Sequence, residues 1–209
     1  MAELSDGVAI RTITFSLLSS PGLFFTFLTI HYIYRSYLFP YLQPSMSPAH
    51  IGVAIFALSF QITNGIAIGG WLGSYGPTTS SNWAKHDLSV YLGTAIWALG
   101  LGLNVWHDDI LRSIRRRRGV VEKGSGEKVY EIPTGGLFEY VFFPHYFTEW
   151  VEWAGWWIVG GVACPPARIF LVNEIATMLP RALQGKRWYV SRFGEKKCEG
   201  KKAVVPGLI

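Results

Sequence analysis

The chain is 209 residues long with a formal net charge of +5, and 50% of its residues are hydrophobic while only 16% are charged. That composition is too apolar for an ordinary soluble domain, and the apolar residues gather in runs of about 20, the length that crosses a bilayer. The excess positive charge flanks these runs. A membrane orientation signal explains it better than nucleic-acid binding, so we expect no nucleic-acid partner. Neither of the two cysteines suggests a disulfide framework or a metal site.

Five apolar segments predict an all-α membrane protein, a multi-span helical bundle of about five transmembrane helices. In chain order the expected spans run from about Ile13 to Leu38, Ile51 to Leu72, Leu88 to Val105, Leu137 to Gly160 and Val162 to Leu179. Each is long enough to cross roughly 30 Å of hydrocarbon at about 1.5 Å per residue. The last two form a hairpin around Pro165-Pro166. We expect one domain over residues 1–209, with a short polar head over 1–12 and a basic tail over 184–209.

Basic residues give these spans an orientation. Arginines crowd the segment 112–118 after the third span, and lysines and arginines crowd 186–202 after the fifth, whereas 73–85 is poor in basic residues. Because cytosolic loops carry the excess of Lys and Arg, we expect a lumenal N-terminus and a cytosolic C-terminus.

The first span carries three polar side chains in its C-terminal half. His31 and Arg35 share one helical face, and Tyr32 lies beside it. A tyrosine can donate a hydrogen bond to a ketone oxygen while it stays neutral at pH 7, which makes Tyr32 a candidate catalytic residue. The competing interpretation is that Tyr32 is an interfacial aromatic residue, as is common near the ends of spans.

A polar face extends the third span. Residues at i, i+4, i+8 and i+11 are Asn104, Asp108, Arg112 and Arg115. A helix that continues past the bilayer presents all four together. Arginines suit the phosphates of an anionic ligand, and Asn or Asp suits its hydroxyl and amide groups. The alternative is a salt bridge between Asp108 and Arg112 on a solvated helix end.

The fourth span opens with an ionisable pair. His145 and Glu149 stand at i and i+4, with Glu152 three residues further on. A metal site would need a third ligand and usually a second histidine, so we expect no metal and predict a hydrogen-bonded pair that lines a polar cavity. The preceding PTGGLF permits a tight turn in which the backbone approaches a ligand, because glycine lacks a Cβ. Arg181 and Tyr189, taken alone, are typical of a basic, aromatic interfacial helix.

These residues stand within a long, ordered set of segments: HYIYR at 31–35, TNG at 63–65, GLGLNVWHDDILRSIR at 100–115, YEIPTGGLFEYVFFPHYFTEWVEW at 130–153, RALQGKRWYVSRF at 181–193 and KKAVVPGLI at 201–209. The set resembles the C-terminal catalytic region of the steroid 5α-reductase family. The resemblance implies a seven-helix membrane bundle of the endoplasmic reticulum, of which this chain would carry about five helices. It also implies two helices further upstream, with an acidic or amide partner for the tyrosine.

The resemblance further implies NADPH as cofactor and, as substrate, a steroid or similar lipid that is an α,β-unsaturated carbonyl compound. Hydride would pass to the β-carbon, and Tyr32 would polarise the carbonyl as negative charge develops on its oxygen. By position, the cofactor-binding residues would be Asn104, Asp108, Arg112, Arg115, His145, Glu149, Arg181 and Tyr189.

Some positions depart from the family pattern. His107 is displaced by one place, Gly185 stands where a histidine is typical, and YLQPSMSP at 41–48 has no arginine. The alternatives are therefore a reductase of trans-2-enoyl thioesters or polyprenals, more remotely an isoprenylcysteine-type methyltransferase, or a truncated bundle without catalytic activity. The GGLFEYV and NVWHDD segments favour the enone reductase.

Overall fold

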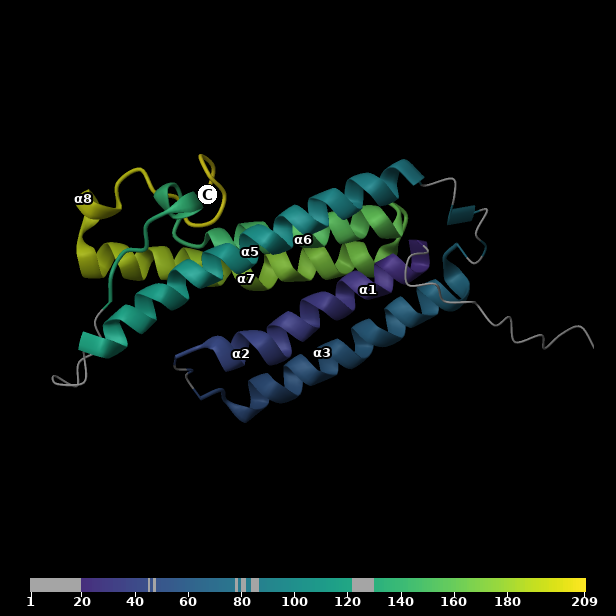
Figure 1. Ribbon diagram of the computed structural model, residues 1–209, viewed down its shortest axis with the longest axis horizontal. Coiled ribbons are helices and arrows are strands. Elements are labelled where there is room, and N and C mark those ends of the chain that lie inside the picture. The colour runs from purple at the N-terminus through teal and green to yellow at the C-terminus, as the bar shows by residue number, and fades with distance from the viewer. Residues whose placement is uncertain are drawn as a thin grey trace, which may run out of the picture.

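The computed structural model describes residues 20–44, 46, 48–77, 79, 82–83, 87–121 and 130–209, and the named elements in these ranges are all helical (Figure 1). They are α1 (Ser20–Ile33), the π-helical turn η1 (Tyr34–Leu38), α2 (Phe39–Leu42), α3 (Ile51–Gly70), the π-helical turn η2 (Trp71–Tyr75), α5 (Asp87–Val121), the 3-10 turn η4 (Gly136–Glu139), α6 (Pro144–Gly160), α7 (Pro165–Phe193) and α8 (Glu195–Cys198). The prediction of an all-α fold is confirmed for these residues.

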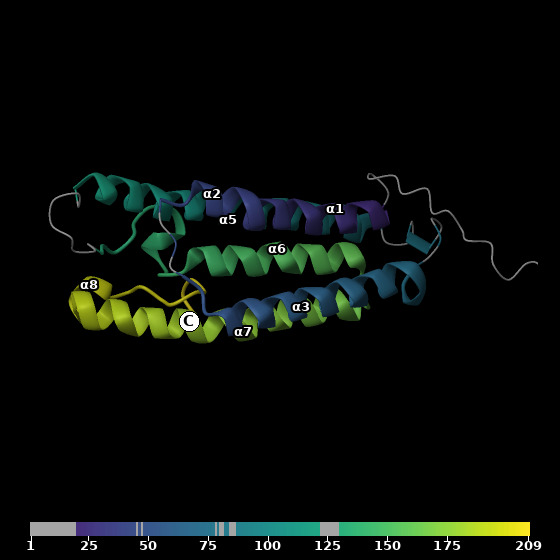
Figure 2. The same ribbon diagram turned by 90° about the horizontal axis from the view of Figure 1, so that it is seen from below.

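Helix α6 lies at the centre of the bundle. Figure 2 shows α1 and α5 on one side of it and α3 and α7 on the other. Trp153 and Trp156 of α6 are buried. Phe24 of α1 stacks on Trp156 with ring centroids 4.2 Å apart, and Phe170 of α7 lies 4.4 Å from Trp153. The core is thus assembled around one aromatic-rich helix that contacts both layers.

Glycine lets α5 and α6 approach closely. A Cβ added at Gly100 would collide with the backbone of Glu152, and one added at Gly155 would collide with the backbone of Trp97. In a bilayer the hydrophobic effect does not drive helices together, and small residues at a helix crossing allow the close backbone packing that does. This contact holds Glu152, and the polar face of α6 to which it belongs, against α5.

Helix α6 begins later than predicted. The expected start near Leu137 is wrong, because Gly135 and Gly136 adopt positive φ and turn the chain into the short η4, which ends before α6 begins. The helix starts at Pro144, in a position where the N–H that proline lacks would have no intrahelical partner.

Helix α7 also differs from its predicted bounds. Pro165 and Pro166 start the helix rather than turn the hairpin, and the turn lies in the residues just before them. The helix continues to Phe193, well past the predicted end at Leu179. The apolar run of the sequence ends near Leu179, whereas the helix continues beyond it.

Helix α5 is longer than a single span. It runs from Asp87 to Val121, past the predicted end of the span at Val105. The predicted polar face required the helix to continue past the span, and it does, because residues 104–115 all lie within α5.

Two helical stretches are long and apolar enough to cross a membrane, Ile51–Tyr75 and Leu88–Arg116. They correspond to the second and third predicted spans. The other three predicted spans are helical over much of their described parts without passing that test, and residues 13–19 of the first span and the predicted polar head over 1–12 lie outside the described residues. The structure therefore supports an all-helical protein with two candidate membrane-spanning helices.

The C-terminal segment docks on the start of α6. The backbone N–H groups of Phe142 and Phe143 donate to the carbonyl oxygens of Lys202 and Ala203, at 3.0 Å each. The ammonium group of Lys201 donates to the carbonyl oxygen of Phe138 at 2.6 Å. The stretch predicted as a basic tail over 184–209 thus consists of the end of α7, α8 and this docked segment.

Candidate active site

Polar side chains of three helical segments meet at Arg35, which lies in η1. Its guanidinium donates to the carboxylate of Asp108 and to the amide oxygen of Asn104, at 2.9 Å each, and it also pairs with Glu149. We call these four residues the Arg35 network. Asp108 thus pairs with the first helical segment rather than with Arg112, its neighbour one turn along α5. Helical irregularities such as η1 are frequent at functional sites.

Asn104 joins α5 to α6 within this network. Its amide nitrogen donates to the backbone carbonyl oxygen of His145 at 2.8 Å and to Oε2 of Glu149 at 3.2 Å. The side chain is fully buried, and its oxygen accepts from Arg35. An unsatisfied buried amide would cost about 1–3 kcal/mol, and here both the nitrogen and the oxygen have partners.

A second buried pair lies one turn before Arg35 on α1 and one turn after Glu149 on α6. Nδ1 of His31 and Oε1 of Glu152 are 2.7 Å apart, and Nε2 of His31 is 3.8 Å from Oε1 of Glu149. Both members of the pair are buried. Ionisable groups inside a membrane bundle are costly unless they are paired, and they mark functional interiors more often than inert packing. Because His31 lies close to both Glu149 and Glu152, it links the Arg35 network to Glu152.

The two predicted arginines of α5 have different environments. Arg112 is buried, pairs with Asp109, and donates to the hydroxyl of Tyr34 at 3.3 Å. Arg115 is exposed and donates to the side-chain oxygen of Gln43 at 3.1 Å. Arg115 is the one of the two whose guanidinium is accessible to a ligand.

A cavity of about 320 Å³ opens beside the Arg35 network. Its lining consists of Arg35, Phe39, Gln43, Asp108, Leu111, Arg115, His145, Tyr146, Glu149 and Met178. Among the described residues, no group hydrogen-bonds the buried Nδ1 of His145, so this nitrogen has an unused hydrogen-bonding capacity next to the cavity. Arginines beside carboxylates and an imidazole suit an anionic ligand that also carries hydroxyl or amide groups.

Tyr32 is held between an aromatic cluster and α3. Its ring centroid lies 5.3 Å from that of His31 and 6.4 Å from that of Trp153. Its hydroxyl oxygen accepts a hydrogen bond of 2.6 Å from Nε2 of Gln61. Tyr32 is connected to the Arg35 network through His31, which is 3.8 Å from Glu149.

The last two predicted site residues do not line the cavity. Arg181 is exposed on α7, and Tyr189 stacks on Phe142 with ring centroids 4.8 Å apart and planes at 18°. Neither belongs to the described lining of the cavity. The structure therefore brings five of the eight predicted cofactor residues, Asn104, Asp108, Arg115, His145 and Glu149, to the network or its cavity.

Two departures from the family pattern have local explanations. A Cβ at Gly185 would collide with the ring of Phe143, so an aromatic side chain from the start of α6 fills that space. The glycine turn before α6 approaches His107, whose Nε2 accepts from the backbone N–H of Leu137 at 3.1 Å. Within the described part of the chain this turn lies close to a histidine of α5, and its close approach to a ligand stays a prediction.

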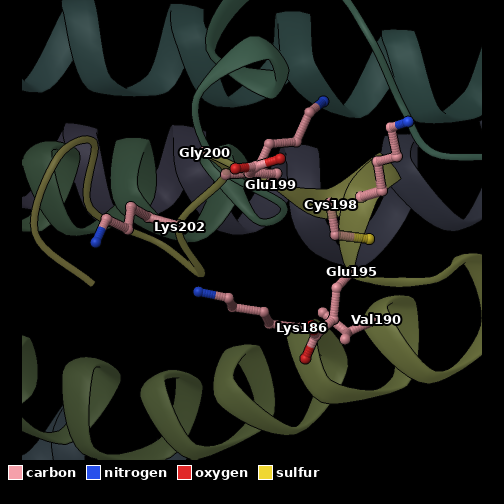
Figure 3. A pocket seen from close by; sticks show the side chains of 9 residues that line it. Lys186, Val190, Glu195, Cys198, Glu199, Gly200 and Lys202 are labelled. Atoms are coloured by element: carbon pink, nitrogen blue, oxygen red, sulfur yellow. The ribbon is translucent and has the colours of Figure 1, made fainter.

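A second cavity, of about 530 Å³, lies between the end of α7 and the segment 195–202 (Figure 3). Its lining is Lys186, Val190, Glu195, Lys196, Cys198, Glu199, Gly200, Lys201 and Lys202. No predicted site residue belongs to this lining as far as the structure describes it. The cavity is basic, and it is separate from the Arg35 network.

Sequence reasoning assigned no site role to Arg35, Gln61 or Glu174. The available signal was polarity inside an apolar segment, which is costly at bilayer depth and so calls for a partner. The missing information was the partner itself. Arg35 pairs with residues 69 to 114 positions away, and Glu174 of α7 acts electrostatically on Tyr32 of α1.

A helical bundle with two candidate membrane spans and a buried, charged network beside a cavity defines a class: helical proteins with a polar cavity in their interior. Comparison with known families narrows that class. The family described as 3-oxo-5-alpha-steroid 4-dehydrogenase matches residues 47–209, and the chain belongs to this family. The resemblance to steroid 5α-reductases is thereby confirmed.

Individual relatives agree with that assignment. Steroid 5-alpha-reductase DET2 of Solanum lycopersicum is 32% identical, over 92% of this chain and 68% of the relative. The 3-oxo-5-alpha-steroid 4-dehydrogenase 1 of Rattus norvegicus is 33% identical, over 86% of this chain and 64% of the relative. The uncharacterized protein C9.08c of Schizosaccharomyces pombe is 35% identical, over 86% and 65% respectively. The chain thus spans about two thirds of the length of these relatives.

Proposed function

We propose that this protein reduces the carbon–carbon double bond of a 3-oxo-4-ene steroid, or of a related α,β-unsaturated carbonyl lipid, with NADPH as reductant. The names of the tomato and rat relatives support steroid reduction as the reaction. One observation carries the proposal: a single cavity is lined by four residues predicted to bind the cofactor, Asp108, Arg115, His145 and Glu149.

The cavity residues fit part of a dinucleotide. Arg115 would bind phosphate oxygens, and Nδ1 of His145 and the carboxylate of Asp108 would bind amide or ribose groups. Asn104 would act through Arg35 and Glu149, which it hydrogen-bonds. NADPH, when bound, supplies the hydride.

The remaining three predicted cofactor residues keep their roles as proposals. Arg112 would support the site from within α5, while Arg181 and Tyr189 would contact a more distant part of the cofactor from α7. Their absence from the cavity lining is compatible with an extended ligand, because a dinucleotide is too large to fit entirely within one cavity of about 320 Å³.

Tyr32 would polarise the substrate carbonyl. When the β-carbon of an enone receives a hydride, negative charge moves to the carbonyl oxygen and an enolate forms. A preorganised donor at such an oxygen contributes about 2.7–4 kcal/mol in a site from which water is excluded. The rings of His31 and Trp153 shield Tyr32 on the protein side and so help to exclude water.

The proposal includes five membrane spans in the endoplasmic reticulum, with the C-terminus in the cytosol. Figures 1 and 2 support a single basic side, because the end of α5 and the short α8 lie at the same end of the bundle. Arg115 and Arg116 belong to the former, and Lys196 and Lys197 to the latter. Positive charge gathered at one end is typical of the cytosolic side.

Product analysis with labelled cofactor tests the proposal. Membranes containing the protein would receive NADPH deuterated at its transferable hydrogen, together with a 4-ene-3-ketosteroid, a polyprenal and a trans-2-enoyl thioester. We expect deuterium at the β-carbon of the steroid product, read by mass spectrometry. Tyr32→Phe should lower turnover about 100- to 1,000-fold, the effect of losing one oxyanion donor, and leave NADPH affinity within a few-fold.

Tyr37→Phe is the matched control, because Tyr37 is an exposed tyrosine of η1. It should leave turnover unchanged. Label in the polyprenal or thioester alone would replace the steroid as substrate class, and absence of label in every product from folded protein would contradict reductase activity.

A further inference from the structure

Gln61 stands out among the polar residues of α3. It lies well inside the candidate span Ile51–Tyr75, and its Nε2 reaches across to the hydroxyl oxygen of Tyr32 on α1, at 2.6 Å. The hydroxyls of Ser59 and Thr63, on the same helix, bond only to carbonyl oxygens of that helix. Gln61 therefore makes the hydrogen bond that joins α3 to the candidate catalytic side chain.

This contact decides which way the Tyr32 hydroxyl can act. A phenol has one hydrogen to donate and lone pairs that accept. Because Gln61 donates to the oxygen, the phenolic hydrogen remains available for donation to another group, and among the described residues no group accepts it. A hydroxyl that already accepts one hydrogen bond is also a stronger donor, because hydrogen bonds in a chain polarise one another.

We propose that Gln61 is a positioning residue, which holds the Tyr32 hydroxyl as a donor toward the carbonyl oxygen of the substrate. The inference rests on the proposed function and extends it to a residue of α3, a helix that contributes no residue to the Arg35 network. As charge builds on the carbonyl oxygen, the Tyr32 hydroxyl shares part of it, and the Gln61 amide stabilises that share. Gln61 itself does not touch the reacting atoms.

Titratable groups near Tyr32 affect how a pH dependence of the reaction must be interpreted. The titratable groups that act on it come from three helices: His31 of α1, Glu149 and Glu152 of α6, and Glu174 of α7. All of these groups are present in the wild type as well. A pH effect can be attributed to position 61 only when the ratio of the variant's kcat to the wild-type kcat changes with pH.

Two substitutions at Gln61 separate positioning from packing. Gln61→Leu keeps the volume and removes the hydrogen bond, and we expect kcat to fall about 10-fold, less than the roughly 100- to 1,000-fold for a direct donor, with KM within about 3-fold. Gln61→Glu introduces a carboxylate that accepts the Tyr32 hydrogen and so withdraws it from the substrate. Its kcat should fall further than that of Gln61→Leu at neutral pH. Relative to wild type it should recover as pH falls and the new carboxyl becomes a donor.

Ser59→Ala is the matched control on the same helix and should match wild type at every pH. A readout without turnover uses a 4-ene-3-ketosteroid labelled with carbon-13 at its carbonyl. The infrared carbonyl stretch of the bound steroid should lie at lower frequency in wild type than in Gln61→Leu, because a weaker donor perturbs the carbonyl less.

The outcomes distinguish the two proposals. An active wild type with unchanged kinetics and an unchanged carbonyl frequency in both variants would overturn the role of Gln61 and leave the proposed reductase standing. If kcat falls equally in Gln61→Leu and Gln61→Glu and does not recover at low pH, Gln61 contributes only to packing and is not a positioning residue. A wild type that neither binds nor reduces the steroid would overturn the proposed function, and the inference with it.

Discussion

The interior beside α6 and the outer face of α3 have opposite polarity. Around α6, buried groups such as Asn104 and Glu149 find partners on other helices. Along α3, Phe56 and Ile66 are each 71% exposed, and both hydroxyl side chains bond to carbonyl oxygens of their own helix. Exposed apolar patches of this kind are rare on water-soluble monomers. The difference teaches that the bundle turns apolar surface outward and keeps polar chemistry inside, as expected where lipid is the solvent.

Removing Arg35 should break the polar region most severely. Arg35→Met keeps the aliphatic bulk but leaves Asp108 and Glu149 as buried carboxylates without their cation, which costs about 3–5 kcal/mol for a broken buried pair. The thermal midpoint in detergent should fall sharply, or folded protein should be lost. Arg115→Met is the control, since an exposed side chain with one hydrogen bond contributes about 0–1 kcal/mol. Equal midpoints for the two variants would show that the Arg35 network does not hold the bundle together.

A charge on the outer face of α3 tests the apolar region. Ile66→Lys places an ammonium group well inside the candidate span, where insertion scales assign lysine a penalty of about 2.5–3.5 kcal/mol. We expect a smaller alkali-resistant membrane fraction. Tyr140→Lys, at a similarly exposed position outside the candidate spans, should change stability by no more than about 0.5 kcal/mol. If both variants stay in the membrane equally, the face of α3 does not contact lipid.

The contact between α5 and α6 offers a smaller and sharper test. Gly100→Ala adds a methyl group that meets the backbone of Glu152, and overpacking of this kind costs about 1–3 kcal/mol. Gly102→Ala, two residues along, points into open space and should be neutral or slightly stabilising, because alanine favours a helix over glycine by about 1 kcal/mol. Thermal unfolding of both variants measures the difference. A reversed order would exclude close packing at Gly100.

Much of the helical layout could be predicted from the sequence. Apolar runs located α3 and most of α5, and the spacing of Asn104 and Asp108 predicted the polar face that the structure shows. The bounds of α6 and α7 were less predictable. Apolar character reports burial or lipid contact rather than backbone conformation, so it continued upstream of Pro144 and ended well before Phe193.

The sequence by itself determined a helical, membrane-type chain, the polar face of α5 and membership of a family, because composition, helical period and motif order are read along the chain. Only the tertiary structure decided that Arg35 is the centre of the network and that Gln61 meets Tyr32. Those contacts join residues 29 to 114 positions apart. They depend on the rotation and height of each helix against its neighbours, which packing sets, and a pattern within one helix does not contain that information.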